Sequence, residues 1–358
     1  MKKIFLIILL AVMSTDYVCA ELPSYAITNI EANWCDRLGD KLVWYLKAKW
    51  IAYKYQLPFL LTPFEGADYF TFYEHEQKLS IEERRNFKKI FRILEERTHT
   101  FSPRTGYLHG IDFGCKINPI KKENFEQFRT MMKPLLMPAN GELPQLHKRD
   151  GVVSIAVQMR KGSGPDKGLI SQQYFSNKKQ KIFFEAEPHI VQEPNETNEA
   201  TYRQVKGGCD GAWPLRFVPN QYYVDQLILL GKAFPNQPLD IFIFTDFANP
   251  AQISAEIEDR VNNPHMTFHY QYDHSVVGYT VARDLFLMAQ CDCLIRPRSH
   301  LSHLAEFIGD HEIVIFPRNY RWNGGKLFIT EVSIKLKDPA IKAIFENITA
   351  NTTKRVTA

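Results

Sequence analysis

The chain has 358 residues, of which 45% are hydrophobic, 13% aromatic and 23% charged, so it is long enough for two packed domains and is neither fibrous nor low in complexity. Its formal net charge of +4 gives no reason to expect a nucleic acid as a partner. The sequence shows no repeat at the spacing of solenoids or propellers.

The first twenty residues have the pattern of a secretory signal peptide. Lys2 and Lys3 precede an apolar run over 4–13, and the small residues Cys19 and Ala20 follow. We expect cleavage after Ala20 and export, to the lumen of the ER or Golgi in a eukaryote, or to the periplasm or the exterior in a bacterium. A buried first strand is the alternative. No other stretch approaches the roughly 20 apolar residues of a membrane span, so none is expected after cleavage.

A first α/β domain is predicted over 21–148, on a strand–helix–strand pattern near its start. A strand-like run over 25–30 leads into a polar turn, and apolar residues at helical spacing follow from Leu42 to Ile51. The segment 57–63 is predicted as a second buried strand that ends at Pro63. A strand–helix–strand unit implies a parallel sheet.

The rest of this domain is predicted from turn and capping signals. Ser80 and Glu83 have the spacing of a capping box, which predicts the start of an amphipathic helix. A long segment rich in turn-forming residues is predicted as a loop, and a second helix is expected to end near Pro134. The first helix is predicted over 80–97 and the loop over 98–114. The second helix is predicted over 121–138 and the linker over 138–151.

A second domain is predicted over 149–335, and 336–358 as a C-terminal tail. Continuous apolar strands alternate with helices, which is typical of a doubly wound parallel sheet covered on both faces. The strands are expected at 152–159, 239–246, 266–271, 293–295 and 312–317, and the helices at 220–234, 249–261, 281–291 and 301–309. The polar stretch 161–211 lacks periodicity, so we expect a functional loop or a mobile lid there.

Ligands of parallel sheets bind at the carboxyl ends of the strands, which directs attention to the residues that follow each strand. After the first strand, Gly39 allows close approach of a ligand, Arg37 could reach an anion, and Asp40 could contact the ligand or cap a helix. After the strand 152–159, Arg160 could hold a diphosphate or form a salt bridge between domains. Asp166 could be a base or a solvated loop residue.

Two further strand ends carry polar side chains. Asp246 could accept hydrogen bonds from a nucleobase or a ribose, or cap the next helix. The stretch "CDCLIRPRSHLSHLAEF", 291–307, places Arg298, Ser299 and Ser302 where a strand gives way to a helix, and helix N-termini favour phosphate. Helix capping by a serine is the alternative, but it does not explain the neighbouring arginines.

The cysteines predict neither a disulfide framework nor a metal site. Removal of the signal peptide would leave five widely spaced cysteines, which allow at most one plausible pair. Cys291 and Cys293 have no companion ligand pair, so we expect buried thiols.

Four segments together resemble the fucosyltransferase superfamily, which includes α-1,2- and α-1,6-fucosyltransferases and protein O-fucosyltransferases. They read "RLGDKLVWYLKAKWIAYKYQLPFLL", "VVSIAVQMRKG", "IFIFTD" and "DLFLMAQCDCLIRPRSHLSHLAEFIG" and span most of the chain that follows the predicted signal peptide. The resemblance implies the GT-B fold, with two Rossmann-like domains whose parallel sheets face a cleft. The first domain would then hold the acceptor and the second the nucleotide sugar.

The resemblance also assigns roles to single residues. Gly39 matches the glycine of the first loop, and Arg160 matches the arginine that contacts the nucleotide diphosphate. Ser299 and Ser302 match a serine pair that approaches the β-phosphate. The chain departs from the family pattern in two places: Asp40 stands where the family has asparagine, and Gln158 where it has histidine.

The resulting hypothesis is a glycosyltransferase that moves fucose from GDP-fucose to a hydroxyl of a glycan or protein, with inversion and without a metal or other cofactor. Asp166 and Glu306 are the candidates for the catalytic base. The alternatives are an inactive GT-B module that binds a glycan or protein, and a transferase that uses another nucleotide sugar.

Overall fold

A computed structural model of the chain describes residues 23–29, 37–96, 99–101, 103–116, 122–161, 181–185, 213–270, 277–323 and 326–354. The predicted signal peptide, most of the polar stretch 161–211 and Asp166 lie outside these residues. None of the described helices is long and apolar enough to cross a membrane.

The first half of the chain forms a parallel sheet of four strands in the order β2-β1-β4-β3. The parallel pairing of β1 with β2 across helix α2 confirms the predicted strand–helix–strand unit. The elements of this half are β1 Tyr25–Asn29, α2 Leu38–Tyr55, β2 Phe59–Leu60, η1 Ala67–Tyr69, α3 Phe72–His75, α4 Ile81–Arg84, β3 Lys89–Glu95, β4 Tyr107–Lys116, α5 Lys122–Met132 and η3 Pro134–Leu136.

The prediction of a helix over 80–97 is wrong beyond the first turn. The capping box is present, because Ser80 Oγ accepts from the Glu83 N–H at 3.1 Å and Glu83 Oε2 accepts from the Ser80 N–H at 2.7 Å. However, α4 ends at Arg84, and Lys89–Glu95 is strand β3. Ile93 is buried while Ile90 is exposed, so this segment follows the two-residue period of a strand.

The loop predicted over 98–114 is also wrong, because β4 begins at Tyr107 and pairs with both β1 and β3. Glycines and polar residues within "YLHGIDFG" resemble a turn in sequence. In the sheet, however, Gly110 pairs with Thr28 on one side and with Arg92 on the other. A strand with neighbours on both sides is stabilised by its backbone hydrogen bonds more than by its own apolar pattern.

The second half forms a sheet of seven strands in the order β6-β11-β10-β9-β5-β7-β8. All its pairs are parallel except the β10–β11 hairpin. The two sheets confirm the prediction of two α/β parts with mainly parallel strands. The elements are β5 Val153–Met159, β6 Lys181–Glu185, η5 Trp213–Arg216, α7 Asn220–Ala233, β7 Leu239–Thr245, α8 Pro250–Val261, β8 Met266–Tyr270, α9 Val277–Ala289, β9 Cys293–Ile295, α10 His300–Ile308, β10 Ile313–Asn323, β11 Lys326–Leu336 and α11 Pro339–Lys354.

The predicted tail 336–358 contains helix α11, so it is not a detached tail over its described part. Phe345 of α11 is fully buried and belongs to the apolar core on one face of the second sheet. The sequence pattern did not predict strands β6 and β11.

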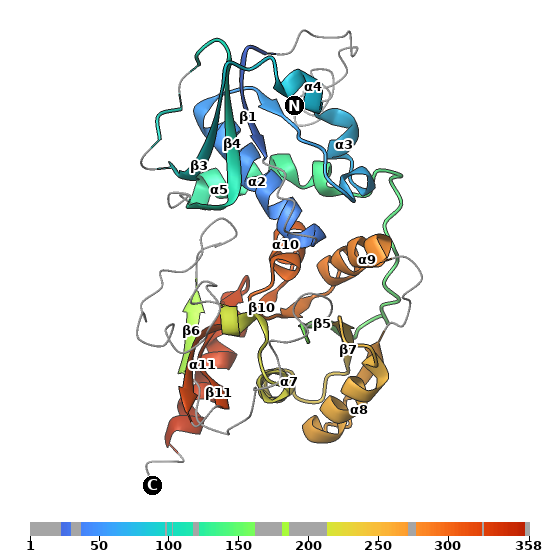
Figure 1. The fold of residues 1–358 in the computed structure, drawn as a ribbon. Helices are drawn as coiled ribbons and strands as arrows, with labels where there is room; N and C mark the ends of the chain where they lie inside the picture. Colours follow the sequence, from blue (N-terminus) through green and yellow to red (C-terminus); the bar gives the residue numbers. More distant parts are fainter. Residues whose placement is uncertain are drawn as a thin grey trace, which may run out of the picture.

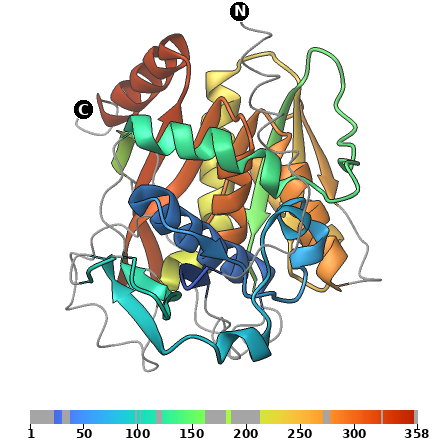
Figure 2. The same ribbon diagram turned by 90° about the horizontal axis from the view of Figure 1, so that it is seen from above.

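The two sheets are stacked end to end, and helices α2 and α10 lie between them (Figure 1). Seen from above, the first sheet and its helices overlie the second half of the chain (Figure 2). One apolar core includes residues of both halves: the ring of Phe307 in α10 lies 5.8 Å from Phe125 of α5, and Phe286 of α9 lies 5.7 Å from Phe70. Seven consecutive residues of α2, 42–48, are buried, because one side of the helix faces the first sheet and another faces α10.

Candidate functional site

The carboxyl ends of β5, β7 and β9 lie side by side at one edge of the second sheet. These strands are parallel neighbours, with Val157 paired to Ile295 and Met159 paired to Thr245. Arg160 lies three residues after Val157, and Arg298 lies three residues after Ile295. Asp246 directly follows Thr245. The fold therefore brings together three of the predicted positions that are far apart in sequence.

Arg160 lies at the end of β5, where it is buried and packed on an aromatic ring. Its guanidinium lies 4.9 Å from the centre of the Phe217 ring, within the range of a cation–π contact. Two residues before Phe217, the Leu215 carbonyl accepts a hydrogen bond of 2.9 Å from the Arg298 N–H. The segment 215–217 thus connects the end of β5 with the turn that follows β9. Sequence reasoning missed this segment, which carries no motif.

Arg298 supports the turn between β9 and α10. Its Nε and Nη2 donate to the carbonyls of Pro317 and Arg318 in β10, at 3.3 and 3.0 Å. These contacts connect the turn to the neighbouring strand. The predicted contact of Arg298 with a nucleotide stays a prediction.

Ser299 is the residue that precedes α10, and only 4% of it is exposed. Its side chain makes no capping hydrogen bond, so capping does not account for this serine. Ser302 is fully buried, and its hydroxyl donates to the Ser299 carbonyl at 3.1 Å. Of the two serines, Ser299 is better placed to reach a ligand at the first turn of α10.

The N-terminus of α2 lies directly against the N-terminus of α10. A Cβ atom at Gly39 would lie 2.9 Å from the backbone nitrogen of Leu301, so this glycine allows the two helices to touch. The close approach predicted for Gly39 is therefore made by another helix. Asp40 is buried and hydrogen-bonded to His300 Nδ1, and Arg37 is the half-buried residue that precedes α2.

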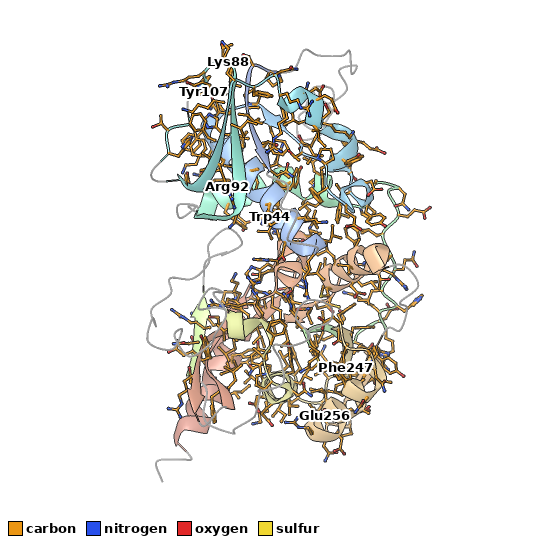
Figure 3. All side chains as sticks on the ribbon, viewed as in Figure 1. Trp44, Lys88, Arg92, Tyr107, Phe247 and Glu256 are labelled. Carbon is orange, nitrogen blue, oxygen red and sulfur yellow. The ribbon has the colours of Figure 1, made fainter. Side chains whose placement is uncertain are left out.

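Figure 3 shows Trp44 on α2 at the level where this helix approaches the second half of the chain. Phe247 and Glu256, labelled in the same view, lie well away from that contact. Trp44 is only 2% exposed, so side chains fill the region around the middle of α2. The N-terminal turn of α2, which carries Asp40, packs on the first turn of α10.

Asp246 is hydrogen-bonded to the backbone that follows β5. One of its carboxylate oxygens accepts the backbone N–H of Lys161, the residue after Arg160. The ammonium of Lys161 is hydrogen-bonded to the Asn220 side chain, and burial lowers its pKa to about 8. Lys161 was not among the predicted residues. The signal that could have found it is its position beside Arg160 at a strand end.

Glu306 lies within α10 between two cations. Its Oε2 accepts from Arg296 Nε and Nη2 at 2.9 and 2.6 Å, and its Oε1 accepts from Lys335 Nζ at 2.6 Å. Burial would raise the pKa of this carboxyl, but Arg296 and Lys335 hold it well below its usual range. A carboxylate held in its charged form by two partners is a poor general base, so the geometry speaks against the predicted catalytic role of Glu306.

Cys291 and Cys293 are buried free thiols, as predicted, and burial raises the pKa of Cys291 to about 12. Within the described residues, no cluster of three or more histidine, cysteine or acidic side chains could hold a metal ion. The other candidate base, Asp166, lies outside the described part of the chain.

No family model matches the chain, and no curated protein matches it. Among solved structures, the α-1,6-fucosyltransferase NodZ soaked with GDP-fucose is 11% identical, with a TM-score of 0.37 over 82% of this chain and 95% of that one. NodZ from Bradyrhizobium is 10% identical, with a TM-score of 0.39 over 88% and 100% of the two chains. A mutant of Arabidopsis thaliana FUT1 in complex with GDP is 11% identical, with a TM-score of 0.47 over 86% and 73%. Likenesses at this level assign neither a family nor an activity to the chain.

Proposed function

We propose that the chain is a glycosyltransferase of the GT-B type that transfers fucose from GDP-fucose to a hydroxyl of a glycan or protein, with inversion. The observation that carries this proposal is the position of Arg160 and the N-terminus of α10 at the same edge of the second sheet. The motifs that resemble the fucosyltransferase superfamily supply the identity of the donor.

The donor diphosphate would bind between Arg160 and the first turn of α10. The first N–H groups of a helix lack partners within the helix and carry the positive end of its dipole, which suits a phosphate. Ser299 makes no side-chain cap there, so these N–H groups are not satisfied by its hydroxyl. As the bond between sugar and phosphate breaks, these donors and Arg160 would stabilise the charge that develops on the phosphate oxygens.

Because the protein's own donors supply this positive charge, we further propose that transfer needs no metal ion. Activity should then be unchanged by EDTA. Asp246 would accept hydrogen bonds from the ribose or base, since it follows the neighbouring strand β7. The first half of the chain, including Arg37 at the start of α2, would contribute to the acceptor side, and the signal-like N-terminus supports a place in the secretory pathway.

Calorimetric titration with GDP tests the proposal. Arg160→Ala should abolish measurable GDP binding, because it removes a buried cation from the diphosphate site. Arg84→Ala, on helix α4 of the first half, is the matched control and should bind GDP as the wild type does. UDP and ADP should bind more weakly than GDP. Unchanged GDP affinity in Arg160→Ala would remove the central claim.

A second candidate is an inactive module that binds a glycan or protein on the same fold. The observation that favours it is the engagement of Glu306 by Arg296 and Lys335, which leaves this candidate base unsuited to catalysis. Hydrolysis of GDP-fucose by the purified protein, measured as release of GDP, separates the two. Release that depends on Arg160 supports the enzyme, and GDP binding without any release supports the module.

A further inference from the structure

Asp40 and His300 form an aspartate–histidine pair across the contact between α2 and α10. Each stands where the strand of its own sheet gives way to a helix, and their side chains are 10% and 14% exposed. A carboxylate can only accept a hydrogen bond, so Nδ1 of His300 must carry the hydrogen that Asp40 receives. The other ring nitrogen, Nε2, is then an acceptor in the neutral ring and a donor in the imidazolium.

His300 is the first residue of α10 and directly follows Ser299. Its side chain therefore belongs to the turn at which the donor phosphate is proposed to bind. An inverting reaction needs its base on the face of the sugar opposite the leaving group. His300 lies on the phosphate side. It is therefore better placed to stabilise the leaving group than to remove the proton of the acceptor hydroxyl.

Charged and titratable side chains lie near His300 on both helices of this contact. From α2, Asp40 faces it, and Arg37 at the start of the same helix is a permanent cation. From α10, the ring of His303 lies 6.4 Å away, and burial together with Arg296 holds the pKa of His303 well below its usual range. His303 is therefore neutral and adds no positive charge beside His300.

We propose that His300 is a catalytic residue whose imidazolium donates an Nε2–H hydrogen bond to the leaving diphosphate, and that Asp40 is the positioning residue that orients it. This inference rests on the proposed function. In the reaction, the bond between the sugar C1 and the phosphate oxygen breaks and its electron pair stays on GDP, while the acceptor oxygen bonds to C1 and its proton passes to water. His300 keeps its proton throughout and stabilises the new charge on the phosphate, with the aspartate stabilising the imidazolium.

The test is GDP affinity by calorimetry for the wild type and for His300→Gln, whose side chain can still form hydrogen bonds but carries no positive charge. A charge-assisted hydrogen bond predicts that the wild type binds GDP about tenfold more tightly than His300→Gln. His269→Gln removes another aspartate-paired histidine, on β8, and should bind GDP as tightly as the wild type does.

Two further variants separate this role from a structural one. Asp40→Asn should reduce this tenfold advantage, and His300→Lys should bind GDP more tightly than His300→Gln, because lysine restores the positive charge. The inference is overturned if His300→Gln binds GDP as tightly as the wild type, or if His300→Lys binds it no more tightly than His300→Gln. Absence of GDP binding by the wild type would instead remove the proposed function, and this inference with it.

Discussion

At the scale of single residues, Glu306 shows how a predicted catalytic group can turn out to be a structural one. Arg296 is 1% exposed, and its guanidinium also lies 4.4 Å from the centre of the Phe316 ring. A buried guanidinium needs a charged partner, which Glu306 supplies. The polar cluster that was noted in the sequence at 291–307 is therefore partly an internal ion pair that fixes α10 on β9 and β10.

Replacement of Glu306 by glutamine should lower the free energy of unfolding by about 3–5 kcal/mol, because it leaves the buried Arg296 and the partly buried Lys335 without their carboxylate. The pKa of Glu306 is lower in the folded than in the unfolded chain. Its contribution is therefore complete above about pH 4.3, the ordinary value, and is lost as the pH falls below it. Urea unfolding at pH 7 and at pH 3 should show the difference between wild type and variant shrinking at the lower pH.

Glu346→Gln is the matched control, since Glu346 pairs with Lys342 at 3.6 Å and its side chain is 53% exposed. A pair as exposed as this contributes at most about 1 kcal/mol. If Glu306→Gln instead unfolds like the wild type but loses turnover, Glu306 is the catalytic base after all.

Sequence reasoning placed Arg160, Asp246 and Ser299 correctly at strand ends, because the apolar strands before them are continuous and easily recognised. It misjudged Glu306 because one of its partners, Lys335, lies on β11, a strand that was not predicted. It gave no role to His300, since the partner Asp40 is separated from it by 260 residues. Contacts at such separation depend on the packing of helices, which no local pattern encodes.

At the scale of elements, the contact between α2 and α10 is set by a glycine. A Cβ at Gly39 would meet backbone atoms of Leu301 at 2.9 and 3.2 Å, and backbone cannot move aside without shifting a helix. The two helix N-termini could not lie this close with any larger residue at position 39. The Asp40–His300 pair depends on this closeness.

Gly39→Ala should therefore lower stability by about 1–3 kcal/mol, the usual cost of an overpacked contact, although alanine favours helices more than glycine does. GDP affinity should fall as well, because α10 is displaced. Gly231→Ala in α7 is the control: its Cβ would meet the Asn263 amide at 2.7 Å and the end of Met266 at 3.0 Å, both on flexible side chains that can move. Thermal unfolding and calorimetry of both variants test this, and an equal effect of the two would contradict it.

Two segments of the first sheet were assigned wrongly. Residues 89–95 were predicted as a helix and 107–114 as a loop, yet both lie in parallel strands of the first sheet. Short apolar runs with interspersed charges fit helical and strand periods almost equally well, and the pairing partner decides between them. Five strands of the second sheet, β5, β7, β8, β9 and β10, were predicted because they are more continuously apolar, as in "LDIFIFT" of β7, whereas β6 and β11 were missed.

At the scale of the whole molecule, the two halves are joined by a common apolar core. Arg129 of α5 adds polar contacts to it, donating to the Phe307 carbonyl at 2.6 Å and to Asp310 at 3.1 Å. The sequence predicted two sheets in series but not that helices of both halves would share one core. Consequently α2 and α10 are held together by packing on several sides, and a ligand at their N-termini would contact residues of both halves.

A crystal structure of the protein with GDP-fucose tests the account most directly. The account predicts the diphosphate within hydrogen-bonding distance of the Arg160 guanidinium and of the backbone N–H groups at the start of α10, with His300 Nε2 beside a phosphate oxygen. A nucleotide bound elsewhere, or one whose diphosphate contacts neither Arg160 nor the first turn of α10, would contradict it.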